Sequence, residues 1–252
     1  MPDLAERLQR AHTNSQMVGW DFSRLDGRMS AKDPGWDYEA DCQAALAQST
    51  HAADLGTGGG ERLIRLLDRV RPEPGSLVAT EGWEPNVPVA RRNLEAYGIQ
   101  VRRYDADAGD RMPFETDSLD LVMCRHEAYD VRELARTIVP GGHFLTQQVH
   151  GRDCQELRDW FGAEVKYPHV TLEHLAADLR DHGFRLELAE EFKGAMTFDE
   201  TESLVEYLAL VPWDVPGFTV DDHLATLESL ESSKPIQVTQ IRFRIYATRE
   251  TS

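Results

Sequence analysis

From about residue 50 onward, apolar residues recur along the chain in two alternating rhythms. Short apolar runs predict buried strands, and stretches with apolar residues three and four positions apart predict helices. The predicted strands cover residues 52–55, 76–80, 99–104, 119–124 and 143–149, and the predicted helices cover 61–70, 87–97 and 131–138. Regular alternation of this kind predicts a parallel sheet with helices on both faces.

Other patterns flank this alternation. Leu4, Leu8 and Ala11 are spaced as on one face of a helix, and a further helix is predicted over residues 38–48. Later in the chain a helix is predicted over 172–181, strands over 184–192 and 236–248, and helices around a proline-rich break within 197–233. The insertion separates the last strand from the others, and we expect that strand to run antiparallel at one edge of the sheet.

Together these elements predict an α/β protein. Its sheet is expected to be Rossmann-like, doubly wound and seven-stranded, mostly parallel with an antiparallel last strand. Residues 1–50 are expected to form a helical N-terminal lid. Residues 51–252 are expected to form one domain, with a helical insertion at about 197–233 before the last strand.

The loop after the first strand of the alternation carries the clearest chemical signal. Its sequence, Asp54-Leu55-Gly56-Thr57-Gly58-Gly59-Gly60, follows a strand and opens a helix. Glycines let the backbone turn sharply and approach a ligand, and the helix start supplies free N–H groups. A dinucleotide loop of the GxGxxG type would have glycine where Glu61 stands, and a carboxylate there suits a pyrophosphate poorly. The spacing DxGxGxG suits a ligand with an amine and a sulfonium better.

Residues 50–150 resemble the class I S-adenosylmethionine-dependent methyltransferases (type 11-like), in which this loop is the first motif. The resemblance implies that Glu81, at the end of the second strand, binds both ribose hydroxyls. It also implies an adenine contact from Asp105 or Asp107, of which we favour Asp107. The implied cofactor is S-adenosyl-L-methionine, with S-adenosyl-L-homocysteine as product. The implied cofactor contacts are Asp54, Leu55, Gly56, Thr57, Gly58, Gly60, Glu81, Gly82, Trp83, Asp107, Ala108, Cys124 and Arg125.

Candidate catalytic residues follow the fourth strand. Methyl transfer from a sulfonium is an in-line displacement, which depends on holding the reactants in line and excluding water. A general base helps only if the acceptor must lose a proton. His126 and Glu127 are the candidates, because the carboxyl end of their strand is expected to face the cofactor. Alternatively, His126 positions the methionine moiety or packs under the lid, and Glu127 pairs with Arg125.

Acceptor contacts are predicted from aromatic residues and one glutamine. Trp20, Trp36 and Tyr38 lie in the expected lid, Trp213 lies in the insertion, and Gln148 ends the fifth strand. Aromatic walls suit a flat or apolar acceptor, or a cation. The alternative is that these aromatic side chains form a small hydrophobic core that fastens the helices to the sheet.

Charge narrows the class of acceptor. The 252 residues include 44 acidic and 27 basic side chains, a net charge of −17, which on average repels a phosphate backbone. We therefore expect a small-molecule acceptor rather than nucleic acid. The alternatives are an RNA or protein methyltransferase, a non-catalytic cofactor-binding protein, and a nicotinamide-dependent oxidoreductase.

Two further features concern metals and membranes. The three cysteines lack CxxC spacing, so no metal site is expected. Apolar runs are too short to span a bilayer, and the first residues are polar and mixed in charge. We therefore expect a cytoplasmic protein without a membrane partner. Oligomeric state has no signature in the sequence.

Overall fold

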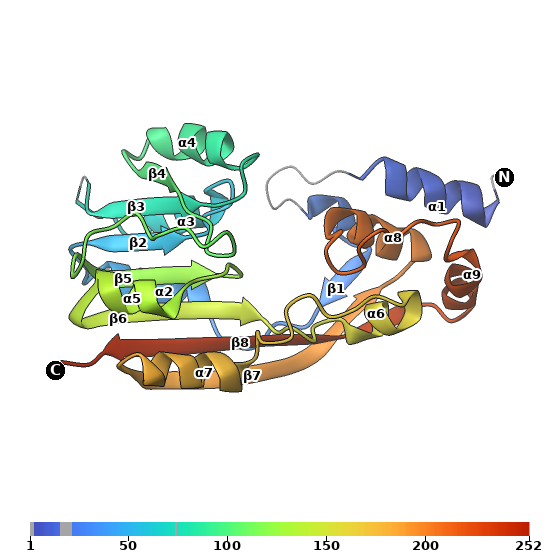
Figure 1. Cartoon of the computed structure of the whole chain (residues 1–252). Coiled ribbons are helices and arrows are strands. Elements are labelled where there is room, and N and C mark those ends of the chain that lie inside the picture. Colours follow the sequence, from blue (N-terminus) through green and yellow to red (C-terminus); the bar gives the residue numbers. More distant parts are fainter. Residues whose placement is uncertain (1–2, 16–21, 74, 252) are drawn as a thin grey trace. The chain divides into compact units, whose positions relative to one another are not determined.

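The computed structural model describes residues 3–15, 22–73 and 75–251 (Figure 1). These residues form two compact units, each built from separate stretches of chain. Unit 1 contains the described residues within 1–34, 150–169 and 192–242, and unit 2 contains those within 35–149, 170–191 and 243–252. Two long strands, β7 (Phe184–Phe198) and β8 (Ile236–Arg249), contribute to both units.

Unit 2 contains the sheet that the alternating pattern predicts. Its strands lie in the order β7-β8-β6-β5-β2-β3-β4. The central strands are parallel, whereas β8 runs opposite to β6 (Figure 1). Their bounds are β2 (Ala52–Leu55), β3 (Leu77–Glu81), β4 (Gln100–Arg103), β5 (Leu119–Arg125) and β6 (Ile138–Val149).

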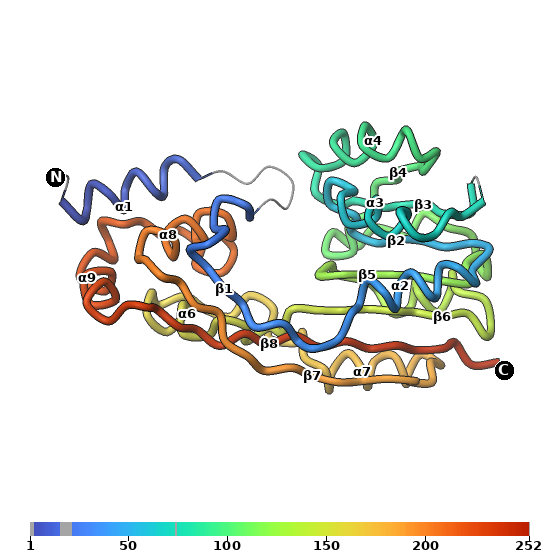
Figure 2. Tube along the Cα trace, turned by 180° about the vertical axis from the view of Figure 1, so that it is seen from behind, coloured from blue at the N-terminus to red at the C-terminus, as the bar shows by residue number. Residues whose placement is uncertain are grey.

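Helices cover both faces of this sheet. Helices α5 (Val131–Thr137) and α7 (Leu172–Asp181) pack on one face (Figure 1), through buried residues such as Leu134 and Leu179. The other face is covered by α2 (Tyr38–Leu46), α3 (Glu61–Leu67) and α4 (Val87–Glu95); α2 and α3 are seen from that side in Figure 2. Apolar burial on both faces explains why β2 is entirely buried.

The order of the strands reverses beside β2. From β2 the chain passes outward to β3 and β4, then returns to β5 on the other side of β2. Ligands of open α/β sheets bind beyond the carboxyl ends of the strands at such a reversal. The glycine loop after β2 and the residues after β5 both lie at this position.

Unit 1 is mainly helical. It contains α1 (Leu4–Thr13), a short 3-10 helix (Ser23–Leu25), α6 (Gln155–Phe161), α8 (Thr201–Leu210) and α9 (Leu224–Ser232). A short strand, β1 (Met29–Ala31), pairs antiparallel with the end of β7, with Met29 opposite Phe198. One apolar cluster joins these elements, including Leu8 of α1, Phe161 of α6 and Leu204 of α8.

The structure confirms the α/β class and the mostly parallel sheet with antiparallel strands. The prediction of seven strands is wrong, because β1 adds an eighth within the segment expected to be helical. Three residues are too few to show an alternating pattern, and β1 is stabilised by pairing with β7. Helix α6 and the extension of β7 to Phe198 were also not predicted. The predicted boundary at residue 50 falls inside unit 2, between α2 and β2.

Candidate functional site at the glycine loop

The loop between β2 and α3 adopts a conformation that requires glycine. Gly60 caps α3 with φ of 89°, and a Cβ atom there would lie 2.9 Å from Cγ of Leu94. Gly56 also has a positive φ, 63°. The loop is fixed to the neighbouring strand, because the Thr57 amide donates a hydrogen bond to the Thr80 carbonyl at 2.8 Å. Backbone amides are thereby held at the carboxyl edge of the sheet.

Glu81 ends β3 directly beside this loop. Its side chain is only 2% exposed, and its two oxygens accept backbone hydrogen bonds from Gly58 at 2.6 Å and from Trp83 at 2.9 Å. Burial raises the pKa of Glu81, and these amide bonds oppose the rise. Each carboxylate oxygen has a second lone pair, so Glu81 can still accept hydrogen bonds from a pair of ligand hydroxyls.

Asp54, the acidic residue that precedes the glycines, is fully buried and forms an ion pair with Arg62 of α3. The Arg62 guanidinium also lies 5.8 Å from the ring centre of Tyr38. Burial is the largest single influence and acts to lower the pKa of Arg62, but the combined effect of Asp54, Tyr38, Cys42 and Glu39 outweighs it and the pKa is raised. In the part of the chain that the structure describes, Asp54 Oδ2 and Thr57 Oγ1 are buried without a hydrogen-bond partner. Both atoms are therefore available to a ligand or to water.

Arg62 was not among the predicted site residues. A charged residue in the first turn of an amphipathic helix is usually exposed, and only the fold brings Arg62 against Asp54. Its neighbours Leu63 and Leu66 are apolar core residues of the same helix. A buried arginine eight residues after a buried aspartate leaves no distinctive sequence pattern.

Glu127 follows β5 and lies against the glycine loop. Its Oε2 atom is 2.7 Å from the position that a Cβ atom of Gly56 would take. Burial, together with Glu81, Asp107 and Asp105, raises the pKa of Glu127 to about 7, although the hydrogen bond from the Ala128 amide opposes the rise. Predicted residues Cys124 and Gln148 donate hydrogen bonds to the Glu127 carbonyl, at 3.3 Å and 3.0 Å. They hold the backbone at this point.

The exposed candidate base, His126, has φ of 58° and is linked to Trp36 through Gln147. Nε1 of Trp36 donates to Oε1 of Gln147 at 2.7 Å. That bond directs the Gln147 amide nitrogen toward Nε2 of His126, 3.2 Å away. Nε2 is then an acceptor, which assigns the neutral His126 ring a proton on Nδ1. A proton taken up at Nε2 would break the bond to Gln147.

The segment after β4 supplies the remaining predicted cofactor residues. Asp107 and Ala108 are exposed, whereas Asp105 is half-buried and its Oδ1 accepts from the Ala108 amide at 3.1 Å. Gly82 lies close to this segment: a Cβ atom on it would be 2.8 Å from the Tyr104 carbonyl oxygen. Asp105 therefore lies close to the end of β3, with its Cβ atom 3.1 Å from the position of an added Cβ atom on Gly82.

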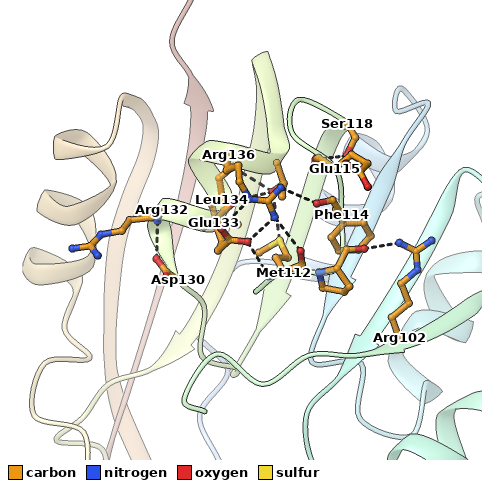
Figure 3. A network of polar contacts seen from close by, with 12 residues as sticks. Arg102, Met112, Phe114, Glu115, Ser118, Asp130, Arg132, Glu133, Leu134 and Arg136 are labelled. Carbon is orange, nitrogen blue, oxygen red and sulfur yellow. Dashed lines mark hydrogen bonds and ion pairs between the residues drawn. The ribbon is translucent and has the colours of Figure 1, made fainter. Parts of the chain in front are cut away.

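A polar network holds the next stretch of the same segment in place (Figure 3). The Arg136 guanidinium pairs with Glu133 at 2.6 Å and donates to the carbonyls of Met112, at 3.0 Å, and Phe114, at 2.8 Å. Glu133 in turn accepts from the Met112 amide at 2.9 Å. The chain after β4 is therefore fastened to α5.

Other predicted residues lie as follows. Arg125 is half-buried, and burial together with Arg62 lowers its pKa. Trp83 is 45% exposed beside Glu81. Tyr38 is buried, and its hydroxyl lies 3.0 Å from the Cys124 carbonyl and 2.9 Å from the Leu145 carbonyl, so it braces two strands.

The predicted acceptor residues are only partly brought together. Trp36, Tyr38 and Gln148 belong to unit 2 with the glycine loop. Trp213 is half-buried against the core of unit 1. Trp20 lies outside the described residues.

Comparison with known proteins assigns this segment to a family. Residues 52–142 match the family described as a methyltransferase domain. YcgJ of Bacillus subtilis, named an uncharacterized methyltransferase, is 26% identical over 113 residues, covering 42% of each chain. Its crystal structure superposes with a TM-score of 0.59 and 14% identity, over 85% of this chain and 99% of that one.

Two curated relatives have named activities. A malonyl-[acyl-carrier protein] O-methyltransferase of Marinomonas is 25% identical over 177 residues, 66% of this chain and 64% of the relative. A demethylmenaquinone methyltransferase of Thermus thermophilus is 33% identical over 103 residues, 36% of this chain and 44% of the relative. The matched regions span less than two thirds of these relatives.

Residues 52–142 therefore form a methyltransferase domain, and the chain has the fold of the class I S-adenosylmethionine-dependent methyltransferases, as the sequence resemblance predicted. The family that residues 52–142 match is one of methyltransferases, which are transferase enzymes.

Within residues 3–15, 22–73 and 75–251, no helix combines the length and the apolar character needed to cross a membrane. Over the same ranges, no group of three or more His, Cys, Asp or Glu side chains is placed to hold a metal ion.

Proposed function

We propose that this chain binds S-adenosyl-L-methionine at the glycine loop and transfers its methyl group to a small-molecule acceptor. The observation that carries the proposal is the Glu81 carboxylate, which is buried at the end of β3 and held by the Gly58 and Trp83 amides. Two unpartnered buried oxygens, on Asp54 and Thr57, adjoin it in the same loop. Family and fold agree with this assignment.

Different residues at this site would contact different parts of the cofactor. S-adenosyl-L-methionine supplies a methyl group on a positively charged sulfur. Glu81 would accept the two ribose hydroxyls with its remaining lone pairs. Asp107, or Asp105, would contact the adenine, and the backbone of Gly56 and Gly58 would lie beside the methionine part. The buried strand ends keep water from the reacting atoms.

Proton removal, where the acceptor requires it, falls to His126 or Glu127. In the tautomer assigned above, Nε2 of His126 accepts a hydrogen bond from the Gln147 amide, and a proton taken from the acceptor would replace that bond. Glu127 has a pKa raised to about 7 by burial and by Glu81, so it is also poised to exchange protons near neutrality. We assign His126 to the acceptor side, because it is exposed and linked to Trp36.

A small acceptor is favoured over nucleic acid by the net charge of −17. The two curated relatives with named substrates act, by their names, on malonyl-[acyl-carrier protein] and on demethylmenaquinone. A flat or apolar acceptor would suit the half-buried Trp36.

The test is a transfer assay with methyl-labelled S-adenosyl-L-methionine against a metabolite extract, a protein extract and total RNA. We expect label in the small-molecule fraction, and we expect Glu81→Gln to reduce it. Label in RNA or protein alone would refute the small-molecule acceptor. Binding of the cofactor without label in any fraction would favour the non-catalytic alternative.

A further inference from the structure

The charge of Asp54 is already neutralised within the protein. Its Oδ1 oxygen pairs with Arg62, and both side chains are inaccessible or nearly so, at 0% and 10% exposure. A buried ion pair has little net charge with which to attract a second cation. Asp54 therefore offers little negative charge to a ligand on the loop, although its buried Oδ2 has no hydrogen-bond partner among the described residues.

Glu127 presents an acidic group to the same loop from β5. Its carboxyl covers Gly56, with Oε2 2.7 Å from the position of an added Cβ atom. The charged groups that act most strongly on it are all acidic: Glu81 at the end of β3, and Asp107 and Asp105 after β4. Acidic groups from the ends of β3 and β4 thus act on the carboxyl that covers Gly56, whereas the charge of Asp54 is offset by Arg62.

Side-chain hydrogen bonds hold the backbone at Glu127 in place. Its carbonyl accepts from Cys124 Sγ and from Gln148 Nε2, and Gln148 also donates to Thr146 at 2.8 Å. Gln148 is only 5% exposed. These bonds fix the point from which the Glu127 side chain reaches the glycine loop.

We propose that Glu127, rather than Asp54, is the carboxylate that receives the positive charge of the methionine end of the cofactor. The inference rests on the proposed function, because it assumes that S-adenosyl-L-methionine or its product binds this loop. It gives Glu127 a positioning role in cofactor binding in place of a role as general base.

If Glu127 has this role, binding of the cofactor releases a proton from its carboxyl group. In the free protein the pKa of Glu127 is raised to about 7 by burial and by Glu81, Asp107 and Asp105, against the Ala128 amide, so near neutrality a fraction of the molecules carries a proton there. Cys124 of β5 is a further titratable group that interacts with Glu127. A bound cation favours the charged carboxylate, so binding releases this proton, and affinity rises with pH through this range.

The test is calorimetric titration at pH 7 with S-adenosyl-L-homocysteine and S-adenosyl-L-methionine, in buffers of different ionisation enthalpy. For the wild type we expect release of a fraction of a proton. Glu127→Gln should abolish this release and weaken binding roughly tenfold, the loss expected for a charge-assisted hydrogen bond. Glu127→Asp keeps the charge and should keep the release.

The matched control is Glu61→Gln, which removes an exposed carboxylate beside Gly59 on the same loop. Glu61→Gln should leave the proton release unchanged. Equal loss for both ligands places Glu127 at the amine that they share, whereas a larger loss for S-adenosyl-L-methionine places it at the sulfonium. Unchanged affinity and proton release in a folded Glu127→Gln protein would overturn the proposal. Failure of the wild type to bind either ligand would instead refute the proposed function.

Discussion

Glu81 is almost completely buried, yet its carboxylate oxygens can still accept further hydrogen bonds. Replacing its carboxylate by an amide keeps the shape but introduces N–H donors toward the Gly58 or Trp83 amide. We expect Glu81→Gln to weaken S-adenosyl-L-homocysteine binding about tenfold to a hundredfold, since hydrogen bonds to charged groups contribute roughly 1.5–3 kcal/mol. Calorimetry measures the loss, with Glu84→Gln, a neighbouring exposed carboxylate, as control. Equal affinities for the two variants would contradict the role of Glu81.

Gly60 tests whether the loop conformation itself is required. Gly60 and Gly109 both have positive φ, but only at Gly60 would a Cβ atom meet a neighbour, Leu94 at 2.9 Å. We expect alanine to cost about 1–2 kcal/mol at either position through backbone strain. Gly60→Ala should cost roughly 1–3 kcal/mol more through overpacking. Urea unfolding of both variants provides the comparison, and a smaller loss at Gly60 than at Gly109 would count against the described packing.

At the scale of elements, α5 stabilises the chain after β4 through Glu133 and Arg136. Bonds from Arg136 lower the pKa of Glu133. A lowered folded-state pKa contributes stability above the ordinary carboxyl pKa, and this stability is lost as pH falls through the folded value. Glu133→Gln should therefore destabilise the protein more at pH 7 than at pH 3. Urea midpoints at the two pH values test this, with exposed Glu95→Gln as control. An effect of Glu133→Gln that does not depend on pH would contradict it.

The elements also show which parts of the structure could be predicted from the sequence. The glycine loop and Glu81 belong to consecutive strand–loop units, so their spacing alone indicates a site. Arg62 and Gln147 act through partners that only the fold supplies, Asp54 and the Trp36–His126 pair. Strand β1 depends on pairing with the far end of β7, about 170 residues later in the chain.

At the scale of the whole molecule, net charge bears on the class of acceptor. With a charge of −17, we expect no measurable affinity for tRNA or duplex DNA at about 0.15 M salt, because long-range repulsion opposes binding to phosphates. Fluorescence anisotropy with labelled tRNA tests this. Affinity that falls steeply as salt rises would reveal a local basic surface and would favour the RNA methyltransferase alternative.

The sheet and the cofactor residues of unit 2 could be predicted from the sequence, whereas the assembly of unit 1 could not. Residues 52–142, which match the methyltransferase domain, lie in unit 2, where the sheet and the cofactor residues were predicted. Unit 1 is assembled from three stretches of chain, and its core joins α1, α6 and α8. Periodicity describes each helix singly and carries no information on such long-range assembly.

The central claim is that the glycine loop of unit 2 holds S-adenosyl-L-methionine. Calorimetric titration of the purified wild-type protein with S-adenosyl-L-homocysteine, beside a parallel titration with NAD, tests it most directly. We predict saturable binding of S-adenosyl-L-homocysteine with one site per chain, and no heat of binding with NAD. Binding of NAD alone, or of neither ligand to a folded protein, would contradict the account.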